Sequence, residues 1–427
     1  MNNHFLLHSD TAVALYECVR SLPILDFHNH ISVADVATDR RYQNLYELWI
    51  ASDPYKHRLM RICGIPERFI TGDAEPYEKF QKFCSVFPYL AGNPVYDWSR
   101  MELSCVFGIE ELPSEASAAR IWERANEMLA SDGFSTRGIL SRFSIEYQSP
   151  VAQIDDDLSV FCGGATAPSL RADSLLSPSE ELKAWLRDTT GIAPDSEDAY
   201  IRAVSVVLNR FDAAGCRFAD HSLDAGFFED DTDGLVVKRL AALAAEYKKR
   251  GWTLLLHVGA KRKTSPRLAR LAGPAGGYAA SGGGFPIETL TDLLGKMEDA
   301  GGLPDTVFFP LNMNDQAPMA ILQGSFSEDM IPSKVQLGPA WWWCDHALGI
   351  ENTLSAIASF GVLSQFIGMT TDSRSILSFV RHDYFRRILC SFLAKQNDGG
   401  WDLPFETLVE LAKKICYYNA KDKINGK

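Results

Sequence analysis

The sequence lacks any Cys-X-X-Cys pair, although it contains nine cysteines scattered from Cys18 to Cys416. Such spacing is typical neither of a disulfide framework nor of a structural zinc site, and it favours a reducing compartment. Residues 1–10 also lack the basic start and the long apolar run of a signal peptide. We therefore expect a cytoplasmic protein.

An excess of positive charge is missing as well, because 42 Lys and Arg face 55 Asp and Glu, for a net charge of −13. Nucleic acid and anionic membrane surfaces need a basic protein face, so neither is an expected partner. A small anionic substrate stays compatible, since a few arginines can make a positive site locally. The surface pattern does not resolve whether the chain forms a homo-oligomer.

No nucleotide-binding motif is present. The Gly-rich stretch 273–284 has neither GxGxxG spacing nor a Lys-Ser/Thr ending, so it is better interpreted as a flexible active-site loop than as a phosphate loop. The one long uncharged stretch, 352–371, contains polar residues and Gly361. We interpret it as a buried helix followed by a buried strand and not as a membrane span.

The sequence does contain a regular alternation of apolar, strand-length runs and amphipathic helices. A chain of 427 residues that is 46% hydrophobic can bury a large core. The alternation predicts a (β/α)8 TIM-type barrel in a single domain, 1–427, with residues 32–143 as a helical insertion after the first strand. The first strand ends at His28, and the other seven expected strands are Val151–Ile154, Pro168–Leu170, Arg217–Ala219, Thr253–Leu256, Thr306–Leu311, Val335–Leu337 and Phe366–Met369.

The first expected strand ends in His28-Asn29-His30, and the last is followed by Asp372. Residues i and i+2 share one face of a strand, and the first and last strands of a closed barrel are neighbours. His28, His30 and Asp372 therefore form a candidate metal triad with positions open for substrate. Taken alone, the two histidines are equally well a polar pair ending an ordinary strand.

Other expected strands also end in chemically capable residues. Arg171 and Arg374 suggest a carboxylate substrate, because arginine at a barrel mouth usually pairs with an anion. His257 alone is equally well a core histidine, and Asp220 can be a helix cap. The run of tryptophans at 341–343 is most simply an apolar wall, of which Trp341 is the expected substrate contact. The fourth strand end has no lysine, which favours one metal over two.

Across most of its length the chain resembles the uronate (glucuronate) isomerases of the amidohydrolase superfamily. The first of the segments that carry the resemblance reads Asp26-Phe27-His28-Asn29-His30. The most specific segments lie in the C-terminal third and include the three tryptophans and Thr371-Asp372-Ser373-Arg374. The remaining segments are 39–45, 53–56, 92–98, 215–221, 257–260 and 381–387.

The resemblance implies a divalent metal, usually zinc, held by the triad, and Arg171 and Arg374 as substrate-binding residues. It also implies that Tyr55 and His257 touch the sugar. The sequence departs from the family at Pro54, where a histidine is common, and in the segments 152–157 and 261–266.

The expected reaction is therefore an aldose–ketose isomerisation of a hexuronate through an enediol: D-glucuronate to D-fructuronate, D-galacturonate to D-tagaturonate, or both. Asp372 is the candidate base, and Tyr55 or His257 would supply or relay a proton. One alternative is a metal-dependent hydrolase or decarboxylase, which would not need the two arginines and Tyr55. Another is a catalytically silent sugar-acid binding protein, against which the intact triad speaks.

Overall fold

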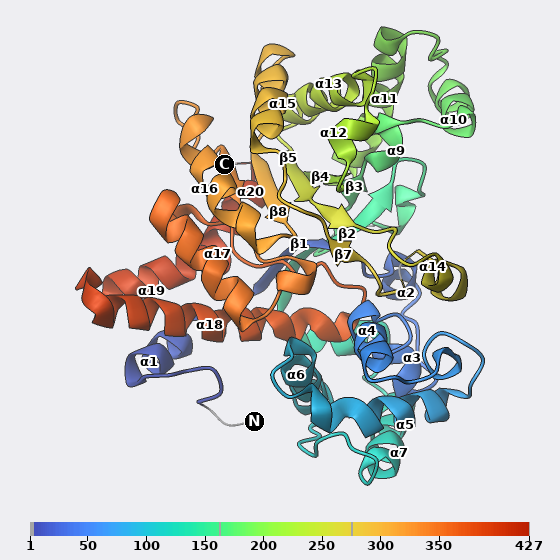
Figure 1. Ribbon diagram of the computed structural model, residues 1–427, viewed down its shortest axis with the longest axis vertical. Helices are drawn as coiled ribbons and strands as arrows, with labels where there is room; N and C mark the ends of the chain where they lie inside the picture. Colours follow the sequence, from blue (N-terminus) through green and yellow to red (C-terminus); the bar gives the residue numbers. More distant parts are fainter. Residues whose placement is uncertain (1–3, 162–163, 275, 427) are drawn as a thin grey trace.

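A curled sheet of seven parallel strands lies at the centre of the structure, a computed structural model that describes residues 4–161, 164–274 and 276–426 (Figure 1). The strand order is β1-β2-β3-β4-β5-β8-β9, so neighbours in the sheet follow chain order. The strands are β1 (Ile24–Asn29), β2 (Ile145–Gln153), β3 (Ser169–Arg171), β4 (Phe218–Leu223), β5 (Thr253–Val258), β8 (Thr306–Pro310) and β9 (Val335–Leu337). A separate antiparallel pair consists of β6 (Ala260–Lys261) and β7 (Ala280–Ser281).

The central strands are buried along their whole length. Every residue of β1, β5 and β8 is buried, and runs such as Leu254-Leu255-Leu256 are apolar without alternation. That pattern is typical of parallel strands covered on both faces. The predicted α/β fold with a parallel sheet is confirmed for these seven strands.

Helices follow the strands and cover the sheet. Helices that start at Glu197, Leu235 and Ile287 lie between successive strands, in agreement with the predicted alternation. The first helix, α1, has Ser9 as its N-cap, whose side chain accepts from Ala12 N. The helices outside the β1–β2 region are α1 (Asp10–Val19), α9 (Asp173–Leu176), α10 (Glu180–Thr190), α11 (Glu197–Ala213), α12 (Phe227–Asp230), α13 (Leu235–Lys249), α14 (Pro266–Ala272), α15 (Ile287–Asp299), α16 (Gln316–Ser325), α17 (Ala347–Phe360), α18 (Val380–Gln396), α19 (Phe405–Lys413) and α20 (Asn419–Ile424).

Between β1 and β2 the chain forms helices and turns. Figure 1 shows α3 to α7 gathered on one side of the sheet. The elements are α2 (Val33–Ala37), α3 (Leu45–Trp49), α4 (Pro54–Ile62), α5 (Pro76–Val86), α6 (Pro94–Phe107), α7 (Ala118–Ala130) and α8 (Thr136–Leu140), with short 3₁₀ turns between them. This helical group carries α4, whose first turn reaches the site described below.

The run Phe366–Met369, predicted as an eighth strand, is not a strand in this structure. The chain after it still bonds to the end of β1 and to the residue that follows this strand, because Asp372 N donates to His28 O (3.1 Å) and His30 N donates to Ser373 O (2.9 Å). On its other side, Ile367 N donates to the Gln336 side chain (2.9 Å). Gly368 has φ +90 and would meet Ile415 O at 2.1 Å if it carried a Cβ, so the backbone leaves the extended conformation there.

Two further observations bear on the sequence-based expectations. No helix of the described residues is long and apolar enough to cross a bilayer. The eight cysteines within the described ranges all have free thiols.

Candidate active site

A cavity of about 360 Å³ opens beside the carboxyl ends of the strands. Its walls come from four separate parts of the chain: the strand ends, the first turn of α4, the Gly-rich loop and the tryptophan run. The predicted site residues that line it are His30, Tyr55, Arg171, His257, Trp341, Asp372 and Arg374. His28, the remaining one, is fully buried beside the cavity. Chain folding thus brings all eight predicted residues to one place.

His28 of β1 and His30, the first residue after β1, converge on Asp372, which lies near the other end of the chain. Nε2 of His30 is 3.0 Å from Asp372 Oδ1, and Nε2 of His28 is 3.4 Å from the same oxygen. The His30 side chain is 27% exposed toward the cavity, whereas that of His28 is inaccessible. Asp372 itself has φ +45. An aspartate in this left-handed conformation is strained, and such residues concentrate at functional sites.

A buried network explains why the segment before Asp372 lies against β1. Asp26 accepts hydrogen bonds from Thr370 Oγ1 (2.8 Å), Thr371 N (2.6 Å) and Thr371 Oγ1 (2.7 Å). His382 of α18 also contacts this carboxylate at 3.3 Å. Sequence reasoning noted Asp26 only as part of a motif and gave it no structural role. The available hint of such a role was that a carboxylate lies inside an apolar run, just before two histidines.

The charges around the triad favour an ionised Asp372. Burial acts to raise the pKa of Asp372, but His28 and His30 outweigh it and hold this pKa well below its usual value. Burial lowers the pKa of His30, against the opposing effect of Asp372. Burial also acts to lower the pKa of His28, yet the close contact with the Asp372 carboxylate and the charge of Asp220 raise this pKa overall. An anion facing two imidazoles is a suitable donor set for a divalent metal.

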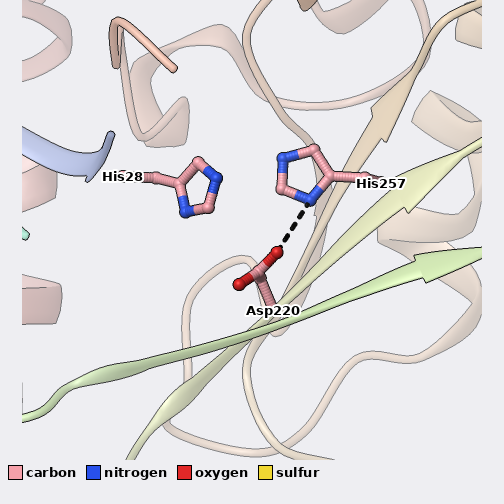
Figure 2. A group of neighbouring side chains, drawn as sticks. All are labelled: His28, Asp220 and His257. Carbon is pink, nitrogen blue, oxygen red and sulfur yellow. Dashed lines mark ion pairs between the residues drawn. The ribbon is translucent and has the colours of Figure 1, made fainter. Parts of the chain in front are cut away.

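A second group shares His28 with the triad. Figure 2 shows His28, Asp220 and His257 pointing toward one another from three different strands. The His28 and His257 ring centres are 4.8 Å apart, and His257 Nδ1 is 3.6 Å from Asp220 Oδ2. Within the described residues, neither ring nitrogen of His28 or His257 has a hydrogen-bond partner, and all three side chains are buried. Unpartnered buried nitrogens of this kind fit a metal or a substrate atom.

The described residues therefore offer two groups that could hold a metal ion, and both contain His28. They differ in their surroundings. Asp220 already forms an ion pair with Arg171 Nη1, so a cation bound there would sit beside a guanidinium. Asp372 is hydrogen-bonded instead by the neutral Trp341 indole, through its Oδ2. Like charges disfavour a metal in the group of Figure 2.

The two predicted substrate arginines have different environments. Arg171 is held by Asp220, by Asp173 (2.8 Å) and by Ser222 (2.6 Å), so its anion partners are in the protein. Arg374 is exposed, lines the cavity, and forms no ion pair within the described ranges. An incoming carboxylate therefore finds its free cation at Arg374. Sequence reasoning could not separate the two, because Asp220 and Ser222, which hold Arg171 together with the nearby Asp173, come from the neighbouring strand β4.

Arg262 also lines the cavity, and sequence reasoning noted it only as part of an unusual loop. It pairs with Asp224 at 3.0 Å and lies 5.4 Å from the centre of the Trp342 ring. The sequence Lys261-Arg262-Lys263 already indicated that this loop brings positive charge to the site.

Tyr55 enters the cavity from the first turn of α4. Asp53 caps this helix, accepting from Tyr55 N at 2.9 Å, and Pro54 occupies its first position. The Tyr55 ring meets the Trp98 and Trp343 rings edge to face, with centres 5.4 Å and 5.3 Å away. Burial raises the pKa of Tyr55, so the phenol is protonated and can donate.

His257 and the tryptophans close the cavity on its other side. Burial lowers the pKa of His257 well below its usual value, so its imidazole is neutral near pH 7. The Trp341 ring centre lies 4.8 Å from that of His257. The Trp341 indole N–H also donates to Asp372 Oδ2, so Trp341 makes a polar contact in addition to lining the cavity.

The Gly-rich loop forms part of the cavity rim through Pro274, Gly277 and Ala279. It is held by donors of the helical group and the tryptophan run: Arg58 and Trp343 both donate to Ala279 O at 3.1 Å. A Cβ at Gly277, which has φ +79, would lie 2.3 Å from Pro54 O. Glycine is therefore required where this loop meets α4. Ala275, also in the predicted loop, lies outside the described residues.

The sequence comparisons with known proteins agree with one another on the family of this chain. The chain matches the sequence profile of a family described as glucuronate isomerase over residues 1–241 and 234–423. It is 35% identical to a uronate isomerase of Caldanaerobacter subterraneus subsp. tengcongensis, with 99% of this chain and 98% of that protein covered. It is 33% identical to a uronate isomerase of Oceanobacillus iheyensis, with 98% and 97% covered.

Solved structures agree with the sequence matches. The crystal structure of a uronate isomerase from Thermotoga maritima superposes with a TM-score of 0.90, at 25% identity and with 99% of each chain covered. The curled parallel sheet and the arrangement of elements around it are thus shared with that protein.

Proposed function

Because this chain belongs to the glucuronate isomerase family, we propose that the cavity beside its strand ends is where it interconverts the aldose and ketose forms of a hexuronate. The family makes the chain a uronate isomerase, an aldose–ketose isomerase that acts on a small sugar acid. The observation that carries the site assignment is the convergence of His28, His30 and Asp372 at a cavity that Arg374 also lines, an arginine without an ion-pair partner among the described residues.

We assign one divalent metal to His28, His30 and Asp372. The unpartnered nitrogens of His28 and the ionised Asp372 support this assignment, and the guanidinium at Asp220 disfavours the alternative group. Nitrogen and oxygen donors in this combination suit zinc, which is our choice of ion. When bound, such an ion would hold the substrate carboxylate with its neighbouring hydroxyl and stabilise negative charge that develops on the sugar.

Arg374 is the residue that we propose binds the substrate carboxylate. Arg171 also lines the cavity, but it is already paired with Asp173 and Asp220. A guanidinium can grip a carboxylate through two parallel N–H bonds, which fixes orientation as well as charge. The aromatic and aliphatic parts of the lining, including Trp341, would contact the apolar face of the sugar. Positioning of this kind converts binding energy into a lower barrier.

The reaction moves one proton from C2 to C1 of the sugar, and one hydroxyl proton from O2 to O1, through an enediol. We propose Asp372 as the group that takes the C2 proton and returns it to C1, because it is ionised. Tyr55 is protonated, and the neutral His257 has unpartnered nitrogens. These two are therefore suited to give and relay the proton between the oxygens.

The proposal extends to the architecture. We infer that residues 366–373 complete a (β/α)8 barrel between β9 and β1, which is supported by the two backbone bonds to the end of β1 and to the residue that follows this strand. We further infer that 1–427 is one barrel domain, with 32–143 a helical insertion whose helix α4 reaches over the site.

The test of the function is an assay of the purified protein with D-glucuronate and D-galacturonate, following ketose formation. We expect that D-glucuronate gives D-fructuronate, that D-galacturonate gives D-tagaturonate, or that both substrates react. Hydrolysis or decarboxylation of another small carboxylate without any ketose product would replace the isomerase by a hydrolase on the same scaffold. Binding of uronates with no turnover would make the protein a sugar-acid binder.

Arg374→Lys should lower kcat/KM by about 10–100-fold, because lysine keeps the charge but not the two-pronged geometry. The melting temperature should change little, since Arg374 is exposed. Arg120→Lys is a matched control, as Arg120 is an exposed arginine on α7 outside the cavity. Near-normal kinetics for Arg374→Lys would remove Arg374 from the site, and a lower melting temperature would make it structural.

A further inference from the structure

A fully buried arginine lies directly behind Tyr55. Arg381, near the start of α18, has its guanidinium carbon 4.8 Å from the centre of the Tyr55 ring and 3.7 Å from the centre of the Trp98 ring. The two rings meet edge to face. Arg381 therefore fills the space between Tyr55 and the helical group, and it fixes the side of the ring that faces away from the cavity.

The charge of Arg381 is only loosely compensated. Its nearest acid is the buried Asp345, whose Oδ2 is 3.5 Å from Arg381 Nη1. Within the described residues, Arg381 Nε and Asp345 Oδ1 have no hydrogen-bond partner. Burying two charges costs free energy that one long ion pair does not recover, and an apolar side chain would fill the same space at lower cost. Packing alone thus does not account for an arginine at this position.

The electrostatic surroundings of Tyr55 indicate what this charge does. Burial, Asp345 and Asp372 all raise the pKa of Tyr55, whereas Arg381 lowers it. The carboxylates of Asp53 and Glu102 also act on Arg381, but both are paired with the buried Lys56. The positive charge in contact with the Tyr55 ring is that of Arg381.

We propose that Arg381 is a positioning residue for Tyr55, and that with Asp345 it holds the phenol in the orientation and the electrostatic setting in which Tyr55 meets the substrate. This inference rests on the proposed function of Tyr55. Arg381 does not line the cavity and need not touch the sugar. Its effect should therefore appear in turnover and disappear when the Tyr55 hydroxyl is removed.

The experiment is a double-mutant cycle with Tyr55→Phe and Arg381→Met, in which kcat, KM, metal content and melting temperature are measured. Arg381→Met should lower kcat by about 10–100-fold, a range typical of a misplaced reacting group, and leave KM and metal content nearly unchanged. Arg381→Lys should recover part of the lost turnover, since it restores the charge. The double variant should be no slower than Tyr55→Phe alone, because both changes act through one hydroxyl.

The same helix offers a matched control. Arg387 lies over the ring of Tyr16 with its guanidinium carbon 4.3 Å from the ring centre, and it pairs with Asp383 at 2.9 Å. Arg387, Tyr16 and Asp383 thus repeat the combination of an arginine, a tyrosine and a carboxylate at the contact between α1 and α18. Arg387→Met should lower the melting temperature and leave kcat unchanged.

Three results would overturn the inference while leaving Tyr55 in place: unchanged kcat in Arg381→Met, independent effects in the double variant, or equal loss of kcat in Arg387→Met. If Arg381→Met does not fold, Asp345→Asn takes its place. That variant should lower kcat several-fold, and unchanged turnover would contradict the proposal. Wild-type turnover in Tyr55→Phe is a separate result, because it removes the proposed function of Tyr55 itself.

Discussion

Asp372→Asn should leave the purified protein almost free of bound metal and lower kcat on the order of 10³-fold, well beyond the 10–100-fold typical of losing a group that only orients a ligand. The reason is that Asp372 contributes the only anion of the triad, facing both His28 and His30 through one oxygen. An amide at this position removes the charge and places either a weaker donor or an N–H group against the two imidazoles. Metal content by elemental analysis, beside kcat, is the measurement.

The control for this prediction uses the second group around His28. His30→Ala should lose metal like Asp372→Asn, whereas Asp220→Asn and His257→Ala should keep one equivalent. His28→Ala does not discriminate, because His28 belongs to both groups. Full metal in Asp372→Asn would exclude the triad. Loss of metal in Asp220→Asn with retention in His30→Ala would move the ion to the group of Figure 2.

Tyr55→Phe should reduce kcat by roughly 10²-fold or more, the scale of losing a proton-transfer group. The ring contacts with Trp98 and Trp343 would remain, so the helix position and the metal content should not change. Rates with D-glucuronate and D-galacturonate, together with a thermal melt, provide the comparison.

Tyr16→Phe is the matched control, because Tyr16 is a buried tyrosine whose hydroxyl donates to Asp383 far from the cavity. Its loss should cost only about 1–3 kcal/mol of stability, with no effect on turnover. If Tyr55→Phe behaves like Tyr16→Phe, then Tyr55 is a packing residue. The proton-transfer role would then pass to His257.

The sequence was most informative where chemistry follows from local order. The two histidines at the end of β1, His28 and His30, and the alternation of buried strands with capped helices depend on neighbours within a few residues, so periodicity and spacing suffice to predict them. The family resemblance added Tyr55, which no strand pattern would have placed at the site. All of these residues come together as expected.

The rest depends on contacts between distant segments. Arg171 and Arg374 look alike in sequence, yet Asp173 and Asp220 neutralise only the first. Arg381 is one of several arginines in α18, and only the packed structure shows which of them lies behind Tyr55. The absence of the predicted strand at 366–369 has a similar origin, since neither the φ of +90 at Gly368 nor its close approach to Ile415 is visible in the apolar run itself.

The bonds between Asp26 and the segment before Asp372 have a consequence for how the molecule is made. Thr370 and Asp26 are separated by 344 residues in the chain, so β1 leaves the ribosome long before the partner that completes its site. Until then the buried Asp26 carboxylate and the two histidines lack their neighbours, and contacts of such high sequence separation form late and slowly. On the metal assignment proposed above, the triad would be complete only after nearly the whole chain has been synthesised, so metal-loaded protein would be a marker of completed folding.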